Sequence, residues 1–278
     1  MLIKIHLRDI KTFVLDYNSP MLSLPDRPFR YFPSIGSTMD AARAWAEAGA
    51  PDGAVVAADE QTSGRGRLQR RWVTRPGSAL AFSIVLRPAP AELPHLALLS
   101  PLGGLAVCTA LEDTLGLTPQ IKWPNYVLLG RRKTCGILAE SFWQGDILGA
   151  AILGIGINIA PGSVPPPQDL LFPATYVEDF TTALVDRNAL LAAVLEHADR
   201  WRAQLGSPHF MAAWQSRLAF RNEWVEIQAP GEAALVGRLQ GVDADGNLRI
   251  ALESGEEVRL AAGDVRLRPA GLEGDRDV

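Results

Sequence analysis

The sequence is poor in the residues that build covalent or metal-bound frameworks. Its 278 residues include two cysteines, Cys108 and Cys135, which excludes a disulfide scaffold and offers too few thiolates for a cysteine-type zinc site. The 27 basic and 31 acidic side chains leave a net charge of −4, so the field of the whole molecule does not attract polyanions such as nucleic acid or an anionic membrane. Any anion that the protein binds must be held by a local group of cations.

The sequence also shows little sign of a targeting or membrane segment. Charged residues interrupt the apolar residues of the first 17 positions, which excludes the apolar centre of a secretory signal. The apolar stretch at 147–160 is shorter than the ~18 residues that a bilayer requires. We expect a soluble, cytoplasmic protein with no membrane and no nucleic-acid partner.

Local patterns predict an α+β fold, with a mixed, mostly antiparallel sheet flanked by helices. Strands are predicted at 53–61 and 79–88 and, separated by tight turns, throughout 121–158. The predicted helices are 37–49 with Ser37 and Asp40 as a capping box, 93–115 with a kink or break at Pro101 and Gly103–Gly104, 186–205 with Asp186 as N-cap, and 207–219.

The character of the chain changes after about residue 222. Short strand-like segments alternate there with the turns PGE, DADGN and ESGEE, a spacing typical of a small β-barrel. We therefore divide the chain into an N-terminal extension (1–27), a main domain (28–220), a small β-domain (221–270) and a tail (271–278).

The most distinctive stretch is QTSGRGRLQRRW, residues 61–72. Its four arginines offer bidentate forks for phosphate or carboxylate, and its two glycines allow close approach of the backbone. The pattern favours a clamp for an anion, although a solvated basic loop or a Gly-Arg tract that binds RNA would share the composition.

Two further clusters carry chemistry. Lys122 precedes a Trp-Pro-Asn turn and Lys133 opens a strand, where an ammonium group can stabilise charge at a phosphoryl or acyl centre. In the segment GIGIN, Gly154 and Gly156 would let a flat ligand approach the backbone, and Asn158 could hydrogen-bond it. For each of these residues taken alone, the alternative is an ordinary exposed lysine or a glycine that forms a β-bulge.

The segments STMD, DEQTSGRGRLQRRW, IKWPNYVLLGRRKTCGILAE and GIGIN, followed by GDVRLRP, together resemble the biotin protein ligases over about residues 29–269. The resemblance is to the monofunctional class, without an N-terminal DNA-binding domain. It implies the catalytic fold shared by class II synthetases and biotin and lipoate ligases, with a C-terminal SH3-like β-barrel.

The resemblance also implies an ATP-dependent biotin–[acetyl-CoA-carboxylase] ligase reaction. Biotin and ATP would form biotinyl-5′-AMP, and a lysine of a biotin carboxyl carrier protein would then accept the biotinyl group. Mg²⁺ is expected to accompany ATP, with its ligands unassigned, and a homodimer is possible. The carboxylase that supplies the acceptor lysine is not indicated.

Roles for single residues follow from the resemblance. Arg65 and Lys133 are implied to act on the reacting carboxylate and phosphate. The residues implied to bind biotin are Ser37, Thr38, Gln61, Gly64, Arg65, Arg67, Lys133 and Gly136. The residues implied to bind the nucleotide are Arg67, Arg70, Trp72, Lys122, Asn125 and Asn158.

Two positions depart from the family pattern. Tyr126 stands where the family has aspartate, and Gln69 where it usually has glycine. The first removes a carboxylate expected beside the nucleotide, for which Glu140 or Asp146 is a candidate substitute. The alternatives left open are a lipoate or octanoate ligase of the same fold, a non-catalytic binder of biotin or its adenylate and, more remotely, a nucleic-acid-binding module.

Overall fold

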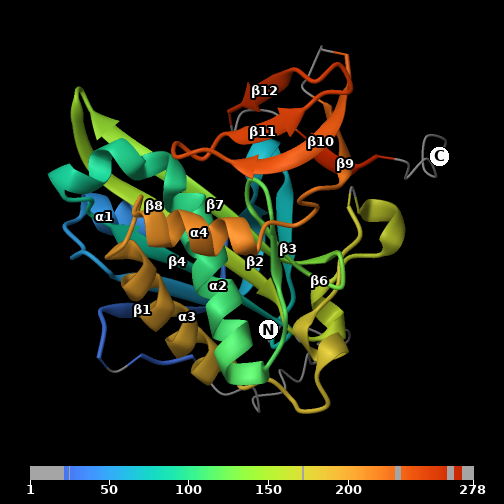
Figure 1. Cartoon of the computed structure of the whole chain (residues 1–278). Coiled ribbons are helices and arrows are strands. Elements are labelled where there is room, and N and C mark those ends of the chain that lie inside the picture. Colours follow the sequence, from blue (N-terminus) through green and yellow to red (C-terminus); the bar gives the residue numbers. More distant parts are fainter. Residues whose placement is uncertain (1–21, 25, 171, 229–232, 262–265, 271–278) are drawn as a thin grey trace, which may run out of the picture.

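A computed structural model describes residues 22–24, 26–170, 172–228, 233–261 and 266–270. These residues form two sheets with helices around the larger one (Figure 1). Residues 1–21 of the expected N-terminal extension, and the expected tail 271–278, lie outside the described residues. The α+β fold and the mostly antiparallel main sheet are confirmed.

The main sheet has eight strands in the order β1-β2-β4-β8-β7-β6-β5, with β3 paired to β2. Only the β1–β2 pair is parallel among the described pairs of this sheet. The strands are β1 (Phe29–Ile35), β2 (Val55–Arg65), β3 (Arg71–Thr74), β4 (Ala79–Leu86), β5 (Gln120–Lys122), β6 (Tyr126–Leu129), β7 (Arg132–Gln144) and β8 (Ile147–Asn158).

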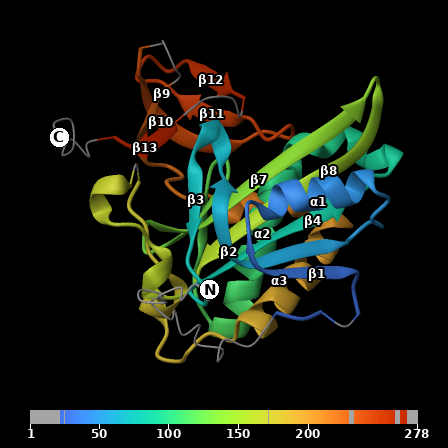
Figure 2. The ribbon, with the colours of Figure 1, turned by 180° about the vertical axis from the view of Figure 1, so that it is seen from behind.

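Helices cover both faces of this sheet, which is why all eight residues of β4 are buried. The helix α1 (Thr38–Glu47) packs on one face, while α2 (Leu99–Leu115), α3 (Arg187–Arg202) and α4 (Pro208–Ser216) lie on the other, as Figures 1 and 2 show from opposite sides. Short 3₁₀ segments make up much of the connection between β8 and α3, at Pro161–Ser163, Pro167–Asp169 and Val177–Phe180.

The break in the second predicted helix falls earlier than expected. A 3₁₀ segment, Pro90–Leu98, leads into α2, and Pro101 lies in the first turn of α2, where a proline is tolerated. Gly103 and Gly104 lie within the helix because of close packing: a Cβ at Gly103 would be 3.1 Å from Ile137 Cγ2. The glycines therefore let the helix approach the sheet and do not kink it.

The segment Pro90–Leu115 is long and apolar enough by composition to span a bilayer, which the stretch at 147–160 is not. Most of it is buried inside the protein, and α2 packs against α3 and against strands of the main sheet. Its hydropathy is accounted for by its position as a core helix.

The two predicted helix starts differ in outcome. Asp186 caps α3 by accepting hydrogen bonds from the backbone of Asn188 and Ala189. Ser37 occupies the N-cap position of α1, but its side chain makes no capping hydrogen bond, and Asp40 pairs with Arg65 instead. The predicted capping box at this helix is therefore wrong, because its acidic member is engaged by the arginine stretch.

The second sheet has five antiparallel strands in the order β12-β11-β10-β9-β13. These are β9 (Trp224–Gln228), β10 (Leu235–Val242), β11 (Leu248–Ala251), β12 (Glu257–Leu260) and β13 (Arg266–Pro269). The indole of Trp123 donates a hydrogen bond of 3.0 Å to the carbonyl of Gly246. This sheet is thus docked on the main domain beside the Trp-Pro-Asn turn (Figure 1).

Candidate functional site

A row of mostly small residues crosses the α1 face of the main sheet. Each residue of the row pairs directly with the next one on the neighbouring strand, so all the side chains of the row point to the same face. Large side chains stand at one end of the row and glycine or alanine fills the rest, which leaves a trough. From β5 to β2 the row is Lys122, Tyr126, Gly136, Gly156, Ala81 and Ala58.

The stretch at 61–72 is an ordered arm beside this trough. Strand β2 continues to Arg65, four residues beyond its predicted end, and Gly64 pairs with Trp72 on β3. The turn between the two strands has its left-handed backbone at Leu68, with a φ of 58°. The left-handed position is therefore next to Gln69 and not at Gln69 itself. We call residues 65–72 the arginine loop.

The indole of Trp72 lies flat on the floor of the trough. A Cβ at Gly156 would be 2.4 Å from Trp72 Cε2, and one at Gly136 would be 3.0 Å from Trp72 Cζ3. The glycines therefore admit a flat group against the backbone. In this structure the flat group is a side chain of the arginine loop.

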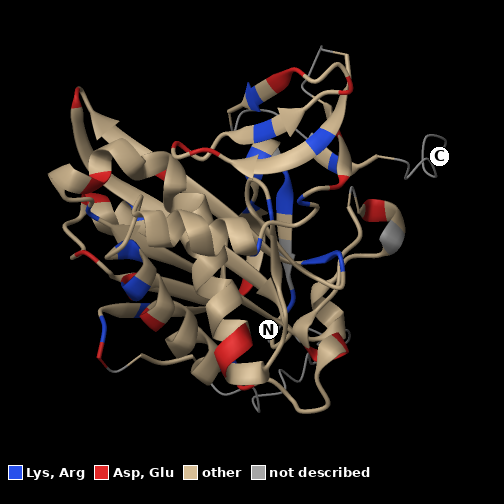
Figure 3. Ribbon diagram, in the orientation of Figure 1, with Lys and Arg blue, Asp and Glu red and all other residues tan. Residues whose placement is uncertain are grey.

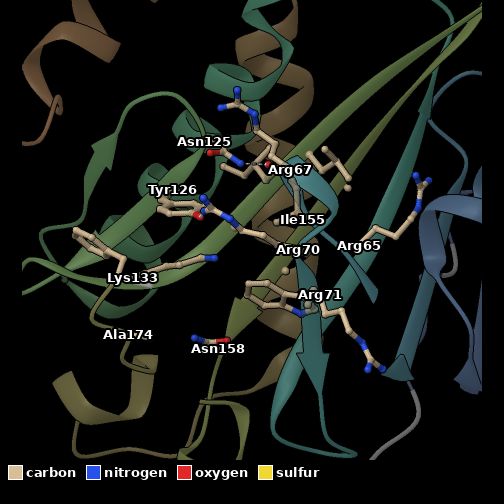
Figure 4. A pocket seen from close by; sticks show the side chains of 18 of the residues that line it. Arg65, Arg67, Arg70, Arg71, Asn125, Tyr126, Lys133, Ile155, Asn158 and Ala174 are labelled. Atoms are coloured by element: carbon tan, nitrogen blue, oxygen red, sulfur yellow. Dashed lines mark hydrogen bonds between the residues drawn. The ribbon is translucent and has the colours of Figure 1, made fainter. Parts of the chain in front are cut away.

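The four arginines of the loop point in different directions (Figure 4). Arg70 reaches into the trough, where its guanidinium donates a hydrogen bond of 2.9 Å to the hydroxyl of Tyr126. Arg65 points away from Lys133 and is paired with Glu140 and Asp40. Arg71 donates to the carbonyl of Thr62. The expected clamp is thus divided between a residue inside the trough and residues that hold the base of the arm.

Two buried lysines meet at Tyr126. The ammonium group of Lys133 lies 3.9 Å from the centre of the Tyr126 ring and 5.2 Å from that of Trp72. The ammonium group of Lys122 lies 5.1 Å from the Tyr126 ring and 4.9 Å from the ring of Phe172. The aromatic faces partly offset the charge of these cations, which burial would otherwise disfavour.

The clustering of cations shifts the pKa of each group. Burial, followed by the charges of Lys133 and Arg70, lowers the pKa of Lys122 to about 7. Burial also lowers the pKa of Lys133. For Tyr126, burial raises the pKa, but the charges of Lys133 and Arg70 outweigh burial and lower it. The positive potential of these groups therefore favours the binding of an anion at this site.

A polar network lies at the other side of the trough. The side-chain oxygen of Gln61 accepts hydrogen bonds from the backbone nitrogen and the hydroxyl of Thr38, at 2.8 and 3.1 Å. The hydroxyl of Ser83 donates to that of Thr38. Ser37 Oγ, in contrast, is buried without a hydrogen-bond partner in the described part of the chain. The predicted residues Ser37, Thr38 and Gln61 are therefore brought together.

Both predicted asparagines are buried and partly engaged. The amide nitrogen of Asn125 donates to the carbonyl of Ile137 at 2.7 Å, and that of Asn158 donates to the carbonyl of Thr175 at 2.9 Å. Asn125 thereby fixes the Trp-Pro-Asn turn against β7. Each contact uses one of the two N–H groups of the amide, and a donor group on a ligand would be recognised by the amide oxygen.

Trough, loop and second sheet together line a cavity of about 440 Å³, which is within the usual size range of small-molecule sites. Its lining includes two lysines and five arginines, whereas Asp169 is the one carboxylate among the described residues that line it. Figure 3 shows basic residues gathered along β2 and β3 below the second sheet. An excess of cations beside an apolar floor fits a ligand with an apolar ring system and several negative charges.

The described lining does not form a carboxylate cage for a divalent cation. Glu140 pairs with Arg65, and Asp146 lies at the exposed tip of the β7–β8 hairpin, so neither replaces the carboxylate that Tyr126 lacks. No group of three histidine, cysteine or acidic residues suited to a metal occurs among the residues described. These side chains therefore do not fit a metal held by the protein alone.

Sequence reasoning missed several parts of the site. It assigned no role to Ser83, Phe172, Leu267 or Arg268, the last two of which bring the second sheet into the lining. It also missed the contact between Arg70 and Tyr126. The uninterrupted pattern GIGIN was a usable signal for the glycine floor, but no local signal indicated which residues of the second sheet would reach the cavity.

The chain is similar to known proteins over both sheets. Residues 31–158 match the biotin/lipoate A/B protein ligase family, and residues 222–268 match the biotin protein ligase C terminal domain. The biotin–[acetyl-CoA-carboxylase] ligase of Paracoccus denitrificans is 36% identical over 221 residues, which cover 74% of this chain and 88% of that protein. The protein of the same name from Mycobacterium tuberculosis is 31% identical, with 83% and 85% covered.

Longer relatives match over a smaller share of their length. The bifunctional ligase/repressor BirA of Bacillus spizizenii is 38% identical over 165 residues, which cover 59% of this chain and 49% of that protein. The chain thus spans about half the length of this relative and of its counterpart in Bacillus subtilis.

Solved structures share the architecture. The biotin protein ligase from Aquifex aeolicus in complex with biotin and ATP superposes with a TM-score of 0.75 at 29% identity, covering 87% of this chain and 99% of that one. The apo structure of the Aquifex aeolicus protein gives a TM-score of 0.71 at 25% identity.

Proposed function

Because the chain belongs to the biotin/lipoate A/B protein ligase family, we propose that it is an ATP-dependent biotin protein ligase of the cytoplasm. It would join biotin to AMP and then transfer the biotinyl group to a lysine of a biotin carboxyl carrier protein. The observation that carries the proposal is the meeting of Lys122, Lys133 and Arg70 at one end of a floor made of Gly136 and Gly156.

The first step joins two anions, so it requires their repulsion to be reduced. A carboxylate oxygen of biotin would attack the α-phosphorus of ATP, forming the mixed anhydride while the bond to pyrophosphate breaks. Lys133, whose ammonium group faces the Tyr126 ring, would contact the carboxylate and the α-phosphate, and Lys122 and Arg70 would contact the phosphates. Fixed cations in a low-dielectric cavity stabilise the charge that develops in this step.

The ring system of biotin would lie at the other end of the trough. The Thr38–Gln61 pair, together with the adjacent hydroxyl of Ser37, would supply the donors and acceptors that a ureido group requires. Gly64 pairs with Trp72 in the arm, and Gly136 lies on the floor beside Lys133. Arg67 would bind between carboxylate and phosphate. Asn125 and Asn158 would face the nucleotide with their amide oxygens.

Mg²⁺ would enter as part of the substrate Mg·ATP. The lining offers Asp169 as its one described carboxylate, which supports binding through the phosphates and not through a protein cage. Cations of the chain would then provide most of the protein's share of charge compensation.

In the second step the acceptor lysine would attack the carbonyl of the anhydride as a neutral amine. The amide bond forms, the bond to AMP breaks, and the amine loses its proton. Closure of the arginine loop over the trough would keep water from the anhydride until the acceptor arrives.

The test is a mass-spectrometric assay with Mg·ATP, biotin or lipoate, and a biotin carboxyl carrier domain, in which acyl-adenylate and the mass of the carrier are measured separately. A biotin-dependent mass shift is the expected result. A shift with lipoate alone would indicate the lipoate ligase, and binding of biotin with neither product would indicate a non-catalytic binder.

A matched pair of variants ties this activity to the trough. Gly156→Ala places a methyl group within 2.4 Å of the Trp72 indole, whereas Gly149→Ala, on the same strand, meets its nearest neighbour at 3.4 Å. We expect Gly156→Ala to lower adenylate formation by at least about tenfold, since misplacing a bound reactant by about 1 Å has effects of this size or larger. Equal activities of the two variants would refute the placement of the site.

A further inference from the structure

Tyr126 is the residue through which Arg70 of the arginine loop contacts the far side of the trough. Its hydroxyl accepts the hydrogen bond from Arg70, and its ring is faced by Lys133 from β7 and Lys122 from β5. The loop emerges from β2, while Tyr126 lies on β6, and strands β4, β8 and β7 lie between them. The contact therefore closes the loop across three strands.

We propose that Tyr126 is a positioning residue that holds the arginine loop closed through Arg70, and that the phosphate of the adenylate replaces the hydroxyl as the partner of Arg70. We call the contact the Arg70–Tyr126 latch. The inference rests on the proposed function for the identity of the ligand, but the latch itself is a property of the free protein.

The chemistry of a phenol suits this role. The Tyr126 side chain presents a single oxygen to Arg70, at a distance of 2.9 Å, and its ring accommodates both ammonium groups. An aspartate at this position would form ion pairs with the same cations and would compete with a phosphate for them. A neutral hydroxyl is a weaker partner, which a phosphate can displace.

The contacts of Arg65 and Arg71 do not duplicate the latch. Arg65 pairs with Glu140 and Asp40, and Arg71 donates to the carbonyl of Thr62, at the base of the arm. Arg71 is therefore a suitable control, because it follows Arg70 directly in the sequence but contacts the arm and not Tyr126.

The groups facing Tyr126 also predict a dependence on pH. These groups are Lys122, Lys133 and Arg70, all cationic when protonated, and Lys133 and Arg70 lower the pKa of Tyr126. A phenolate would bind Arg70 more tightly than a phenol, so the loop of the wild-type protein should open less readily as pH rises through the alkaline range. A variant without the hydroxyl should lack this change.

The first experiment measures hydrogen exchange of the loop amides in the full-length protein without ligand. Tyr126→Phe should accelerate exchange at residues 65–72 by about tenfold, the value of one hydrogen bond to a charged group. Arg70→Ala should have a similar effect, and the double variant should exceed neither by much, because the two substitutions remove the same contact. Tyr126→Phe combined with Arg71→Ala should be additive.

The second experiment measures release of preformed biotinyl-adenylate from the same variants. Because the phosphate takes the place of the Tyr126 hydroxyl in the complex, Tyr126→Phe should change the release rate by less than about twofold, whereas Arg70→Ala, which removes the group that binds the phosphate, should speed release by about tenfold or more. Additive effects of Tyr126→Phe and Arg70→Ala on exchange would overturn the latch. If the wild-type protein formed no adenylate, the proposed function would fail, and the exchange data would still decide on the latch.

Discussion

At the scale of single residues, Lys122 is an ammonium group that the fold keeps from water. Lys122 is 6% exposed, and the pKa of its ammonium group falls to about 7 from an ordinary value of 10.5. The charged form is therefore less stable in the folded chain than in the unfolded one. Phosphate oxygens would reverse this, which makes the lysine useful for ligand binding and costly for folding.

The sign of the pH effect follows from that shift. Between pH 7 and pH 10.5 the unfolded chain binds more protons at Lys122 than the folded chain does, so this residue makes stability rise with pH across that window. Lys122→Met should therefore be more stable than wild type near pH 7, by on the order of a few kcal/mol, and the difference should shrink toward pH 10. Urea unfolding at pH 7.0 and 9.5 measures this.

The same variant should bind ATP poorly, which calorimetry can determine. A difference in stability between Lys122→Met and wild type that stays constant from pH 7.0 to 9.5 would contradict the shifted pKa. Urea unfolding of the wild-type protein over the same pH range supplies the reference.

Some residues of the site could be predicted from sequence and others could not. The pattern GIGIN indicated a glycine floor, and the departure at Tyr126 was visible against the family pattern. The partner of Tyr126 was not predictable, because Arg70 is 56 residues away and its direction depends on the turn at Leu68. For the same reason Arg65 was placed on the ligand, although in this structure it faces Glu140 and Asp40.

At the scale of elements, the arm formed by β2 and β3 is held at its base by one ion-pair cluster. Arg65 donates two hydrogen bonds to Glu140, at 2.8 and 2.9 Å, and also pairs with Asp40 of α1. These side chains are partly exposed, so the pair contributes modestly to stability. We expect removal of this ion pair to change how readily the arm opens.

We expect Arg65→Ala to abolish retention of the adenylate, and Glu140→Gln to speed its release by roughly two- to fivefold, the range of a partly exposed ion pair. Quench-flow measurement of adenylate release gives both rates. Glu47→Gln, which breaks an exposed pair with Arg43 on α1, is the control and should have no effect. If Arg65 acted only by direct contact with the ligand, Glu140→Gln would behave like this control.

The elements themselves followed closely from local patterns. Tight turns within 121–158 predicted the strands of the β5–β8 region, and Asp186 predicted the start of α3. The predicted position of the break before α2 was wrong because a proline or glycine can either interrupt a helix or be accommodated within it. Pro101 falls in the first turn, where its missing N–H is not needed, and Gly103 provides room for Ile137, a contact that is long-range and invisible locally.

At the scale of the whole molecule, the second sheet completes the cavity. Leu267 and Arg268 of β13 belong to its lining, and Gly246 rests against Leu98 and Trp214 while its carbonyl accepts from Trp123. Docking of this sheet thus connects the core around α2 and α4 with the end of the cavity that contains Lys122.

Gly246→Ala should weaken that docking. The added Cβ would be 3.0 Å from Leu98, at a residue whose φ is 84°, so both crowding and backbone strain apply. Gly255→Ala has the same strain, with a φ of 87°, but nothing within 4 Å. We expect Gly246→Ala to lose about 1–3 kcal/mol more than Gly255→Ala and to raise the KM for ATP.

Thermal unfolding and steady-state kinetics on both variants test this expectation. Equal losses of stability would mean that backbone strain accounts for the whole effect and that the second sheet is held elsewhere. A loss of stability without a change in the KM for ATP would separate docking from the lining role of Arg268.

The indole of Trp72, lying on Gly136 and Gly156, also affects the hydration of the site. The floor that a ligand would cover is already shielded from solvent in the free protein. A ligand that takes the place of the indole therefore releases little ordered water from the glycine backbone, and part of the apolar area buried on binding is only exchanged. Association should accordingly show a smaller negative heat-capacity change than the contact area of the ligand alone would give.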